Sequence, residues 1–336
     1  MTGQHIDAPA SPAREVLPVS VPRSWTRRHV LDLDDFSVDE IEQVLDTTNA
    51  MKEILARDVP RAPALRGTTI ITLFYESSTR TRASFELAGK VLGADVINIT
   101  ASGSSVDKGE SMIDTVRTLR AVGANVLVMR HGSSGAPYLA AQHTDARIIN
   151  AGDGWHAHPT QGLLDLYTLR GALGDLKGKR IAIVGDVLHS RVARSDIWGL
   201  SKMGAEIVVC GPPTLLPPDL GKNEGNSKAM PNVTIEKNVD HAIAGADAVM
   251  TLRLQHERMA GGLIPSLREY SRLYQITDAR MALAKPGAPV LHPGPMNEGV
   301  EITAALAHGH RSLIEEQVTN GVAVRMALLY LMRGAK

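Results

Sequence analysis

TTIITLFYESSTRTRASFELAGKVL, residues 68–92, is the stretch that decides the fold of this chain. Residues 68–76 form an apolar run typical of a buried strand, and residues 83–92 have the pattern of a helix. Between them, SSTRTR places hydroxyl side chains and two guanidiniums, those of Arg80 and Arg82, at the helix start. A buried strand that leads directly into a helix predicts one unit of a parallel α/β sheet.

The SSTRTR segment has two interpretations. Ser and Thr are ordinary N-cap residues, and an arginine often does no more than solvate the first turn of a helix. The free N–H groups and the positive end of the dipole at a helix start also favour an anion, and Arg80 can hold two of its oxygens. The hexapeptide alone leaves capping and phosphate binding open.

Strand-like and helix-like runs alternate along most of the chain, which predicts βαβ units. The strand-like runs lie at 94–100, 125–130, 147–151, 179–186, 206–210, 247–252 and 289–292. Helix-like runs lie at 111–124, 135–144, 159–173 and 312–332, and another extends from the end of the 179–186 strand to about residue 205. In the last segment, 312–332, Val318, Val322, Met326 and Leu329 repeat at helical spacing.

The pattern predicts an α/β fold with two doubly wound parallel-sheet domains of similar size, linked by long helices. We expect a flexible N-terminal arm at residues 1–24. The first domain is expected to combine residues 25–160 with residues 313–336, and the second to comprise residues 161–312.

Composition argues against several classes of protein. The 336 residues contain 36 Lys plus Arg and 36 Asp plus Glu, so no net field attracts nucleic acid or a membrane surface. The single cysteine, Cys210, lies in an apolar strand-like run, which predicts a buried thiol. The N-terminus has no apolar signal segment, and no later run reaches the roughly 18 apolar residues of a membrane span. We therefore expect a cytoplasmic protein with no nucleic-acid or membrane partner.

No cofactor motif is found. VGDVLHSR, residues 184–191, follows a strand where a dinucleotide fold carries its glycine-rich turn, but it lacks G-x-G-x-x-G. No G-x-x-x-x-G-K-[ST] phosphate loop is present either. We expect no nicotinamide or flavin cofactor.

DGWHAHPTQ, residues 153–161, is a second candidate site. Asp153, His156 and His158 could form the metal site of a hydrolase. In the alternative that we prefer, the proline after His158 starts a helix and places His158 and Gln161 together at its entrance, where they could bind a substrate carbonyl. No further ligands stand nearby at metal-site spacing.

Further cations lie where strands end or loops begin, which is where parallel sheets bind ligands. Each could instead serve a solvated loop or a structural ion pair. Two arginines in the second half of the chain suit a dicarboxylate, because arginine holds a carboxylate with two parallel hydrogen bonds. The candidates are Ser104 and Lys108 in the loop SGSSVDKGE (residues 102–110), Arg130, Arg191, and Arg253 with Gln255.

Taken together, these segments resemble the transcarbamoylase family, and most closely its aspartate-using branch. The similarity runs from about Ser24 to the C-terminus, and no cysteine stands where the ornithine-using relatives typically carry one. Glu298 is a departure, because many similar bacterial chains carry arginine there. The matching segments are Ser78-Thr79-Arg80-Thr81-Arg82, the Lys108 loop, Met129-Arg130-His131, His158-Pro159-Thr160-Gln161, Arg191, Arg253-Leu254-Gln255 and His292-Pro293-Gly294-Pro295.

The resemblance implies transfer of the carbamoyl group of carbamoyl phosphate to L-aspartate, a step of pyrimidine biosynthesis, without cofactor, metal or covalent enzyme intermediate. It makes the first domain the carbamoyl-phosphate-binding domain and the second the aspartate-binding domain. Arg80, Thr81, Lys108, Arg130 and His158 would act in catalysis. The implied substrate-binding residues are Ser78, Thr79, Arg80, Thr81, Ser104, Lys108, Arg130, His158, Gln161, Arg191, Arg253, Gln255, and the backbone of Gly294 and Pro295.

The family also implies a homotrimer in which Ser104 and Lys108 reach into the active site of a neighbouring subunit. The resemblance leaves three assemblies open: a free trimer, a trimer joined to regulatory chains, and one docked onto dihydroorotase. Carbamoyl transfer to ornithine is the alternative reaction. A metal hydrolase and a non-catalytic scaffold are the alternatives from other classes.

Overall fold

The computed structural model describes residues 25–100, 109–218, 220, 230–255, 259 and 262–334. The predicted N-terminal arm at residues 1–24 and the loop residues Ser104 and Lys108 lie outside the described residues. Among the residues described, no helix combines the length and hydrophobicity needed to cross a membrane.

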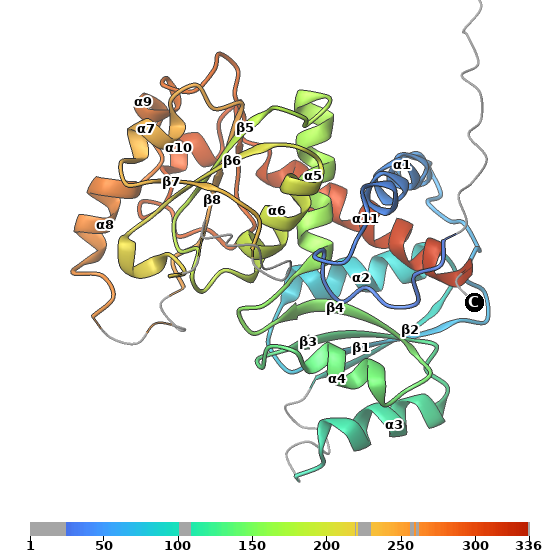
Figure 1. The fold of residues 1–336 in the computed structure, drawn as a ribbon. Helices are drawn as coiled ribbons and strands as arrows, with labels where there is room; N and C mark the ends of the chain where they lie inside the picture. Colours follow the sequence, from blue (N-terminus) through green and yellow to red (C-terminus); the bar gives the residue numbers. More distant parts are fainter. Residues whose placement is uncertain are drawn as a thin grey trace, which may run out of the picture.

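Two parallel sheets form the framework and confirm the predicted fold class (Figure 1). The first sheet has four strands in the order β2-β1-β3-β4, and the second has five in the order β7-β6-β5-β8-β9. The strands of the first sheet are β1 (Thr69–Phe74), β2 (Asp95–Thr100), β3 (Val126–His131) and β4 (Arg147–Asp153). Those of the second are β5 (Arg180–Val184), β6 (Glu206–Cys210), β7 (Thr234–Glu236), β8 (Ala248–Thr251) and β9 (Val290–Leu291).

Helices cover both faces of each sheet, which explains why the strands read as apolar runs. On the first sheet, α3 (Met112–Val122) and α4 (Ala136–Gln142) cover one face, and α1 (Val38–Leu55), α2 (Thr79–Val91) and α11 (Ile314–Gly334) lie on the other (Figure 1). On the second, α5 (Pro159–Leu173) and α6 (Arg191–Lys202) share a core with one face of the sheet. The opposite face packs against α7 (Val239–Ile243), α9 (Asp278–Met281) and α10 (Ala304–Ala307), and the remaining short helices are η2 (Pro213–Leu215) and α8 (Leu267–Tyr274).

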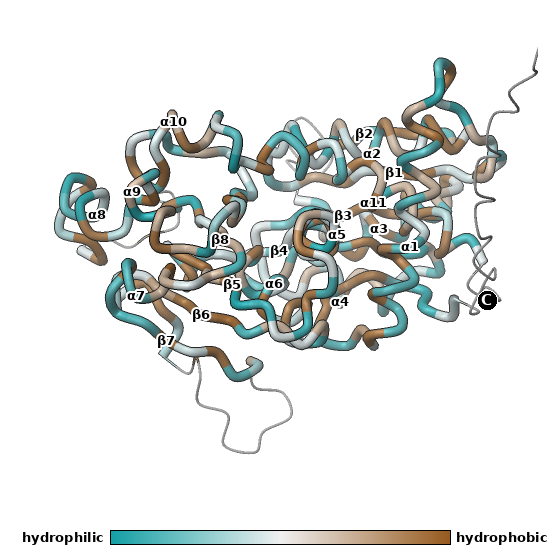
Figure 2. Tube along the Cα trace, turned by 90° about the horizontal axis from the view of Figure 1, so that it is seen from above, coloured by the Kyte–Doolittle hydropathy of each residue, from teal (hydrophilic) through white to brown (hydrophobic). Residues whose placement is uncertain are grey.

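The helices α5 and α11 join the two halves, as predicted. α5 leads from β4 of the first sheet to β5 of the second, and α11 returns from β9 to pack against α1, α2 and α5. One buried hydrophobic cluster therefore runs through both halves. Figure 2 shows the two halves from above, with hydrophobic residues along strands such as β6.

Each sheet has a point at which its strand order reverses. The chain places β2 on one side of β1 and then β3 on the other, and it likewise places β6 and β8 on opposite sides of β5. Parallel sheets bind ligands outside the carboxyl ends of the strands at such a point. Phe74 pairs with Arg130 there in the first sheet, and Val184 pairs with Thr251 in the second.

Two sequence expectations are confirmed. Cys210 is a free, buried thiol, and the C-terminal segment is one long helix. However, Val318 is 51% exposed, so the predicted apolar repeat of α11 does not lie wholly in the core. Most of α11 after Val318 is buried because the helix packs against several neighbours, and a single stripe does not describe such a surface.

Candidate active site

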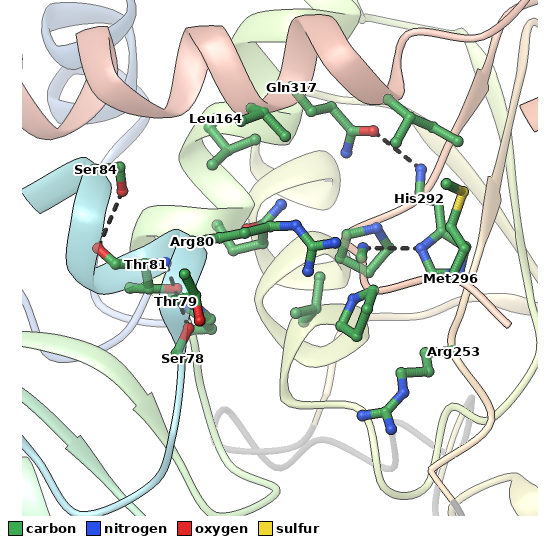
Figure 3. Close-up of a pocket in the computed structure, with 18 of the residues that line it drawn as sticks. Ser78, Thr79, Arg80, Thr81, Ser84, Leu164, Arg253, His292, Met296 and Gln317 are labelled. Atoms are coloured by element: carbon green, nitrogen blue, oxygen red, sulfur yellow. Dashed lines mark hydrogen bonds between the residues drawn. The ribbon is translucent and has the colours of Figure 1, made fainter. Parts of the chain in front are cut away.

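The carboxyl ends of both sheets open onto one cavity of about 990 Å³. Every described substrate-binding residue that the family resemblance implied lines it, and Figure 3 shows residues of α2, α5 and α11 and of the loop at 292–296 around it. These lining residues are Ser78, Thr79, Arg80, Thr81, Arg130, His158, Gln161, Arg191, Arg253, Gln255, Gly294 and Pro295.

The start of α2 supports both interpretations of the SSTRTR segment. Ser78 is the N-cap, and its hydroxyl accepts a hydrogen bond from the backbone N–H of Thr81 at 3.3 Å. The same turn faces the cavity with Arg80, whereas the Arg82 guanidinium lies 5.8 Å from the centroid of the Phe74 ring. Only one of the two predicted guanidiniums therefore lines the site, together with the hydroxyls and dipole of the turn.

Arg80 meets the loop that follows β9. Gly294 has φ of +63°, and a Cβ placed on it would lie 3.1 Å from Cζ of Arg80. A side chain at position 294 would thus crowd the guanidinium and strain the backbone. The Gly294 N–H donates to Nδ1 of His292 at 2.8 Å, and Nε2 of His292 lies 3.2 Å from a carboxylate oxygen of Glu301. These contacts hold the Gly294-Pro295 backbone at the wall of the cavity.

His158 is a buried, neutral imidazole. Burial lowers its pKa well below the usual range, and the nearby guanidiniums of Arg130, Arg191 and Arg325 lower this pKa further. Its backbone N–H donates to the Ser195 hydroxyl at 2.9 Å, which anchors the start of α5 against α6. A neutral imidazole can donate a hydrogen bond to a carbonyl oxygen of a substrate.

Arg191 is held by contacts that cross the site. Its Nη2 donates to a carboxylate oxygen of Glu76 at 2.7 Å, and its Nη1 donates to the carbonyl of Gly154 at 3.1 Å. Nε of Arg130 lies 3.5 Å from the same oxygen of Glu76. Glu76 thus joins two arginines that come from different sheets.

Asp186 organises the second sheet's part of the site. One of its oxygens accepts from the backbone N–H of Gln255 at 3.3 Å, and the other lies 2.8 Å from Nδ1 of His189. The ends of β5 and β8 are thereby tied together, which fixes the segment that carries Arg253 and Gln255.

The alternative metal site at Asp153 and His156 has another structural explanation. The Asp153 carboxylate accepts from the backbone N–H groups of Gly135 at 2.6 Å and Ala157 at 3.1 Å, and from the side chain of Asn150 at 2.8 Å. His156 lies 3.2 Å from the same carboxylate. Within the part of the chain that the structure describes, no three His, Cys, Asp or Glu side chains are gathered as metal ligands.

Sequence reasoning missed several polar residues at or behind the cavity, among them Glu76, Asp165, Gln317 and Arg325. Glu76, Gln317 and Arg325 line the cavity, and Asp165 lies one helical turn from Gln161 and bonds to it. A signal for two of them was present, because Asp165 and Arg325 are polar residues on helices whose neighbours are mostly apolar, whereas Gln317 lies among polar residues. Glu76 ends the strand-like run next to SSTRTR and carried no separate signal.

Glu298, the departure from similar bacterial chains, is not among the residues that line the cavity. Its carboxylate lies 3.1 Å from Nε2 of His308, and both side chains are largely exposed. Glu298 is therefore accommodated by a contact with His308 at the surface.

Comparison with known proteins agrees with this geometry. Residues 28–171 match the model of the aspartate/ornithine carbamoyltransferase carbamoyl-P binding domain, and residues 177–332 match the Asp/Orn binding domain of the same family. The chain is 61% identical over 309 residues to the aspartate carbamoyltransferase catalytic subunit of Roseiflexus sp. (strain RS-1), covering 92% of this chain and 96% of the relative. It is 55% identical over 328 residues to the same subunit of Dehalococcoides mccartyi (strain CBDB1), covering 98% of each.

Solved structures show the same fold. Aspartate transcarbamoylase from Trypanosoma cruzi, in complex with carbamoyl aspartate and phosphate, superposes with a TM-score of 0.77 at 30% identity and covers 91% of this chain and 95% of that one. Ornithine carbamoyltransferase from Pyrococcus furiosus superposes with a TM-score of 0.81 at 25% identity, covering 94% of this chain and 100% of that one. The chain therefore belongs to the aspartate/ornithine carbamoyltransferase family.

Proposed function

We propose that this protein transfers the carbamoyl group of carbamoyl phosphate to the amine of L-aspartate and releases N-carbamoyl-L-aspartate and phosphate. The observation that carries the proposal is the meeting of an anion-binding helix start, a neutral histidine and two further arginines on one cavity. Relatives that are 55% and 61% identical bear the name aspartate carbamoyltransferase.

Carbamoyl phosphate would bind between α2 and α5. Ser78, Thr79, Arg80 and Thr81 would hold its phosphate, and Arg130 would bridge the phosphate and the carbonyl oxygen. The carbamoyl group would contact His158, Gln161 and the backbone at Gly294 and Pro295, which lie on the same cavity.

Aspartate fits the second half of the site better than ornithine. Arg191, Arg253 and Gln255 offer two guanidiniums and an amide, and an acceptor with two carboxylates can engage both guanidiniums. Ornithine would attack through its δ-amine, which leaves one carboxylate and an α-ammonium group for this half of the site, and the second arginine would repel the α-ammonium group. The Trypanosoma cruzi structures include complexes with carbamoyl aspartate and with N-(phosphonacetyl)-L-aspartic acid, which carry an aspartate moiety.

The chemistry requires positioning and charge stabilisation. The unprotonated amine of aspartate attacks the carbamoyl carbon, a C–N bond forms, and the C–O bond to phosphate breaks. Negative charge grows on the carbamoyl oxygen, where Thr81, Arg130 and His158 can stabilise it, and the loss of one such donor typically costs about 10²–10³ in rate. The departing phosphate accepts the amine proton, so no serine nucleophile and no covalent intermediate are needed.

The proposal also covers the assembly of the protein and its location in the cell. The family resemblance supports a homotrimer in which Ser104 and Lys108 act in the neighbouring subunit's site, and a role in pyrimidine biosynthesis in the cytoplasm. We assign carbamoyl phosphate to the domain formed by residues 25–160 and 313–336, and aspartate to residues 161–312. A scaffold without activity would have lost the charged site residues, yet Arg80, Arg130, Arg191 and Arg253 all line the cavity.

The test is a stoichiometry assay with purified full-length protein. With carbamoyl phosphate and L-aspartate, we expect phosphate and N-carbamoyl-aspartate in a one-to-one ratio, unchanged by a strong metal chelator. Phosphate release that does not depend on aspartate and is abolished by the chelator would instead support the metal hydrolase.

A further inference from the structure

A line of hydrogen bonds runs behind the cavity from Gln161 to Gly294. Nε2 of Gln161 donates to Oδ1 of Asp165 at 3.1 Å, and Nε2 of Gln317 donates to the same oxygen at 2.6 Å. Oε1 of Gln317 accepts from the backbone N–H of His292 at 3.0 Å, as Figure 3 shows, and Nδ1 of His292 accepts from the N–H of Gly294. Asp165 therefore connects the two groups that would surround a carbamoyl group.

Asp165 also determines how the Gln161 amide is turned. An ionised carboxylate has only acceptor oxygens, so only the NH2 group of each glutamine can face it. The Oε1 atom of Gln161 is then left on the opposite side of the amide, and Gln161 lines the cavity. Among the described residues no donor reaches this Oε1, so it can accept a hydrogen bond from a ligand.

Asp165 carries a negative charge above about pH 7. Asp165, Asp196 and Arg325 are all buried, at 1%, 1% and 4% exposure. Burial, together with the adjacent Asp165, raises the pKa of Asp196 well above its usual value, so Asp196 holds a proton that it can share with Asp165. Burial raises the pKa of Asp165 to about 7, while Arg325 and the bonds from Gln317 and Gln161 act in the opposite direction. Above this pH the pair carries one proton and one charge.

We propose that Asp165 is a positioning residue that selects the transferred group: by holding Gln161 with Oε1 toward the cavity, it makes the site accept a carbamoyl NH2 and disfavour the methyl group of acetyl phosphate. The proposal rests on the proposed function. The NH2 of carbamoyl phosphate can donate to Oε1, whereas the methyl of acetyl phosphate, which has nearly the same shape, cannot. A polar group of a site that is left unpaired by a ligand lowers the affinity for that ligand.

The experiment compares the dissociation constants of carbamoyl phosphate and acetyl phosphate at pH 8 in the full-length protein and in Asp165→Asn. The substitution introduces an NH2 group beside the NH2 of Gln161, because Nε2 of Gln161 also lies 3.3 Å from Oδ2 of Asp165. The asparagine side chain keeps the Oδ1 acceptor, but its new NH2 repels the NH2 of Gln161 and removes the contact at Oδ2, so the Gln161 amide is held less firmly. We expect the dissociation constant of carbamoyl phosphate to rise about tenfold or more, and that of acetyl phosphate to change less than about threefold.

Thr168→Val is the matched structural control. Thr168 is a buried residue of α5 that accepts a hydrogen bond from Asn320 of α11 at 3.0 Å, and it does not line the cavity. The substitution of Thr168 weakens another polar contact between α5 and α11, the two helices that Asp165 and Gln317 also link, without touching Gln161. We expect this variant to keep the ratio of the two dissociation constants, even where its stability falls.

Gln161→Leu provides a second test that leaves Asp165 unchanged. It should lose the same discrimination between carbamoyl phosphate and acetyl phosphate, and adding Asp165→Asn to it should have no further effect on the ratio of the two dissociation constants, because both substitutions act through one amide.

The proposal is overturned if Gln161→Leu keeps the discrimination, if Asp165→Asn weakens the binding of both ligands equally, or if the effects of the two substitutions on the ratio add. A full-length protein that does not bind carbamoyl phosphate at all would overturn the proposed function as well, whereas normal binding with unchanged discrimination in the variants overturns this inference alone.

Discussion

The carboxylate of Glu76 accepts a hydrogen bond from Nη2 of Arg191 at 2.7 Å. Glu76 follows β1 of the first sheet, and Arg191 begins α6 of the second, so this ion pair links the two halves across the active-site cavity. The arginine that would hold a carboxylate of aspartate is therefore already oriented by a carboxylate of the protein.

Glu76→Ala should weaken the use of aspartate. Arg191 would keep only its bond to the Gly154 carbonyl, and Arg130 would lose the same partner. Hydrogen bonds to charged groups contribute about 1.5–3 kcal/mol, so we expect the KM for aspartate to rise about tenfold or more at saturating carbamoyl phosphate. Glu76→Gln, which keeps an oxygen acceptor, should show a smaller rise, and equal KM values in both variants and the unsubstituted protein would contradict the role.

Arg80→Ala should lower kcat/KM for carbamoyl phosphate by about 10²–10³, because the guanidinium that would hold the phosphate is lost. Arg82→Ala is the natural control, since Arg82 lies two residues further on, against Phe74. We expect it to stay within about threefold of the unsubstituted protein. Equal losses in the two variants, measured by steady-state kinetics, would show that the effect comes from the helix start and not from the phosphate contact.

The site was more predictable from sequence than the contacts that support it. Residues such as Arg80 and His158 could be found because they stand in short motifs at strand ends, where a parallel sheet binds ligands. Glu76 gave no such signal, and the role of Asp165 could not be predicted, because their partners Arg191 and Gln317 lie 115 and 152 residues away. Sequence spacing within a motif carries no information about such partners.

The same distinction holds for the fold. The strand-like run at residues 68–76 and the helix-like run at 159–173 correspond to β1 and α5, because both are buried and strongly patterned. The short β7 was missed, since three residues, two of them polar, give no pattern. The burial of α11 on several sides was not predicted, because a helix with several packing partners has no single apolar stripe.

His158 should make the protein less stable in mild acid. Its pKa is lowered in the folded state, so below a pH of about 6.5 the unfolded chain takes up a proton that the folded chain does not. The free energy of unfolding should therefore fall as the pH decreases from 7.5 to 5.5, by on the order of 1 kcal/mol more in the unsubstituted protein than in His158→Gln. Urea unfolding at the two pH values measures this difference.

His310→Gln serves as the control for the stability measurement, because His310 is exposed. It should retain the pH dependence of the unsubstituted protein. A His158→Gln variant with that same dependence would show that the imidazole is not kept neutral by its surroundings.

Shared active sites predict that two inactive variants restore activity when mixed. Lys108→Ala would remove the residue supplied to a neighbour, and Arg80→Ala the residue used in its own subunit. A hybrid trimer would contain a site in which both Lys108 and Arg80 are present. Activity should return after the subunits are exchanged by mild dissociation, and its absence after exchange verified by mass spectrometry would contradict site sharing.

The most direct test of the proposed function is a competition between acceptors. The full-length protein is given carbamoyl phosphate with equal concentrations of L-aspartate and L-ornithine, and both products are quantified by mass spectrometry. We predict N-carbamoyl-aspartate as the dominant product, with its share reduced by Arg253→Ala because this arginine would hold an aspartate carboxylate. Citrulline as the dominant product would contradict the account.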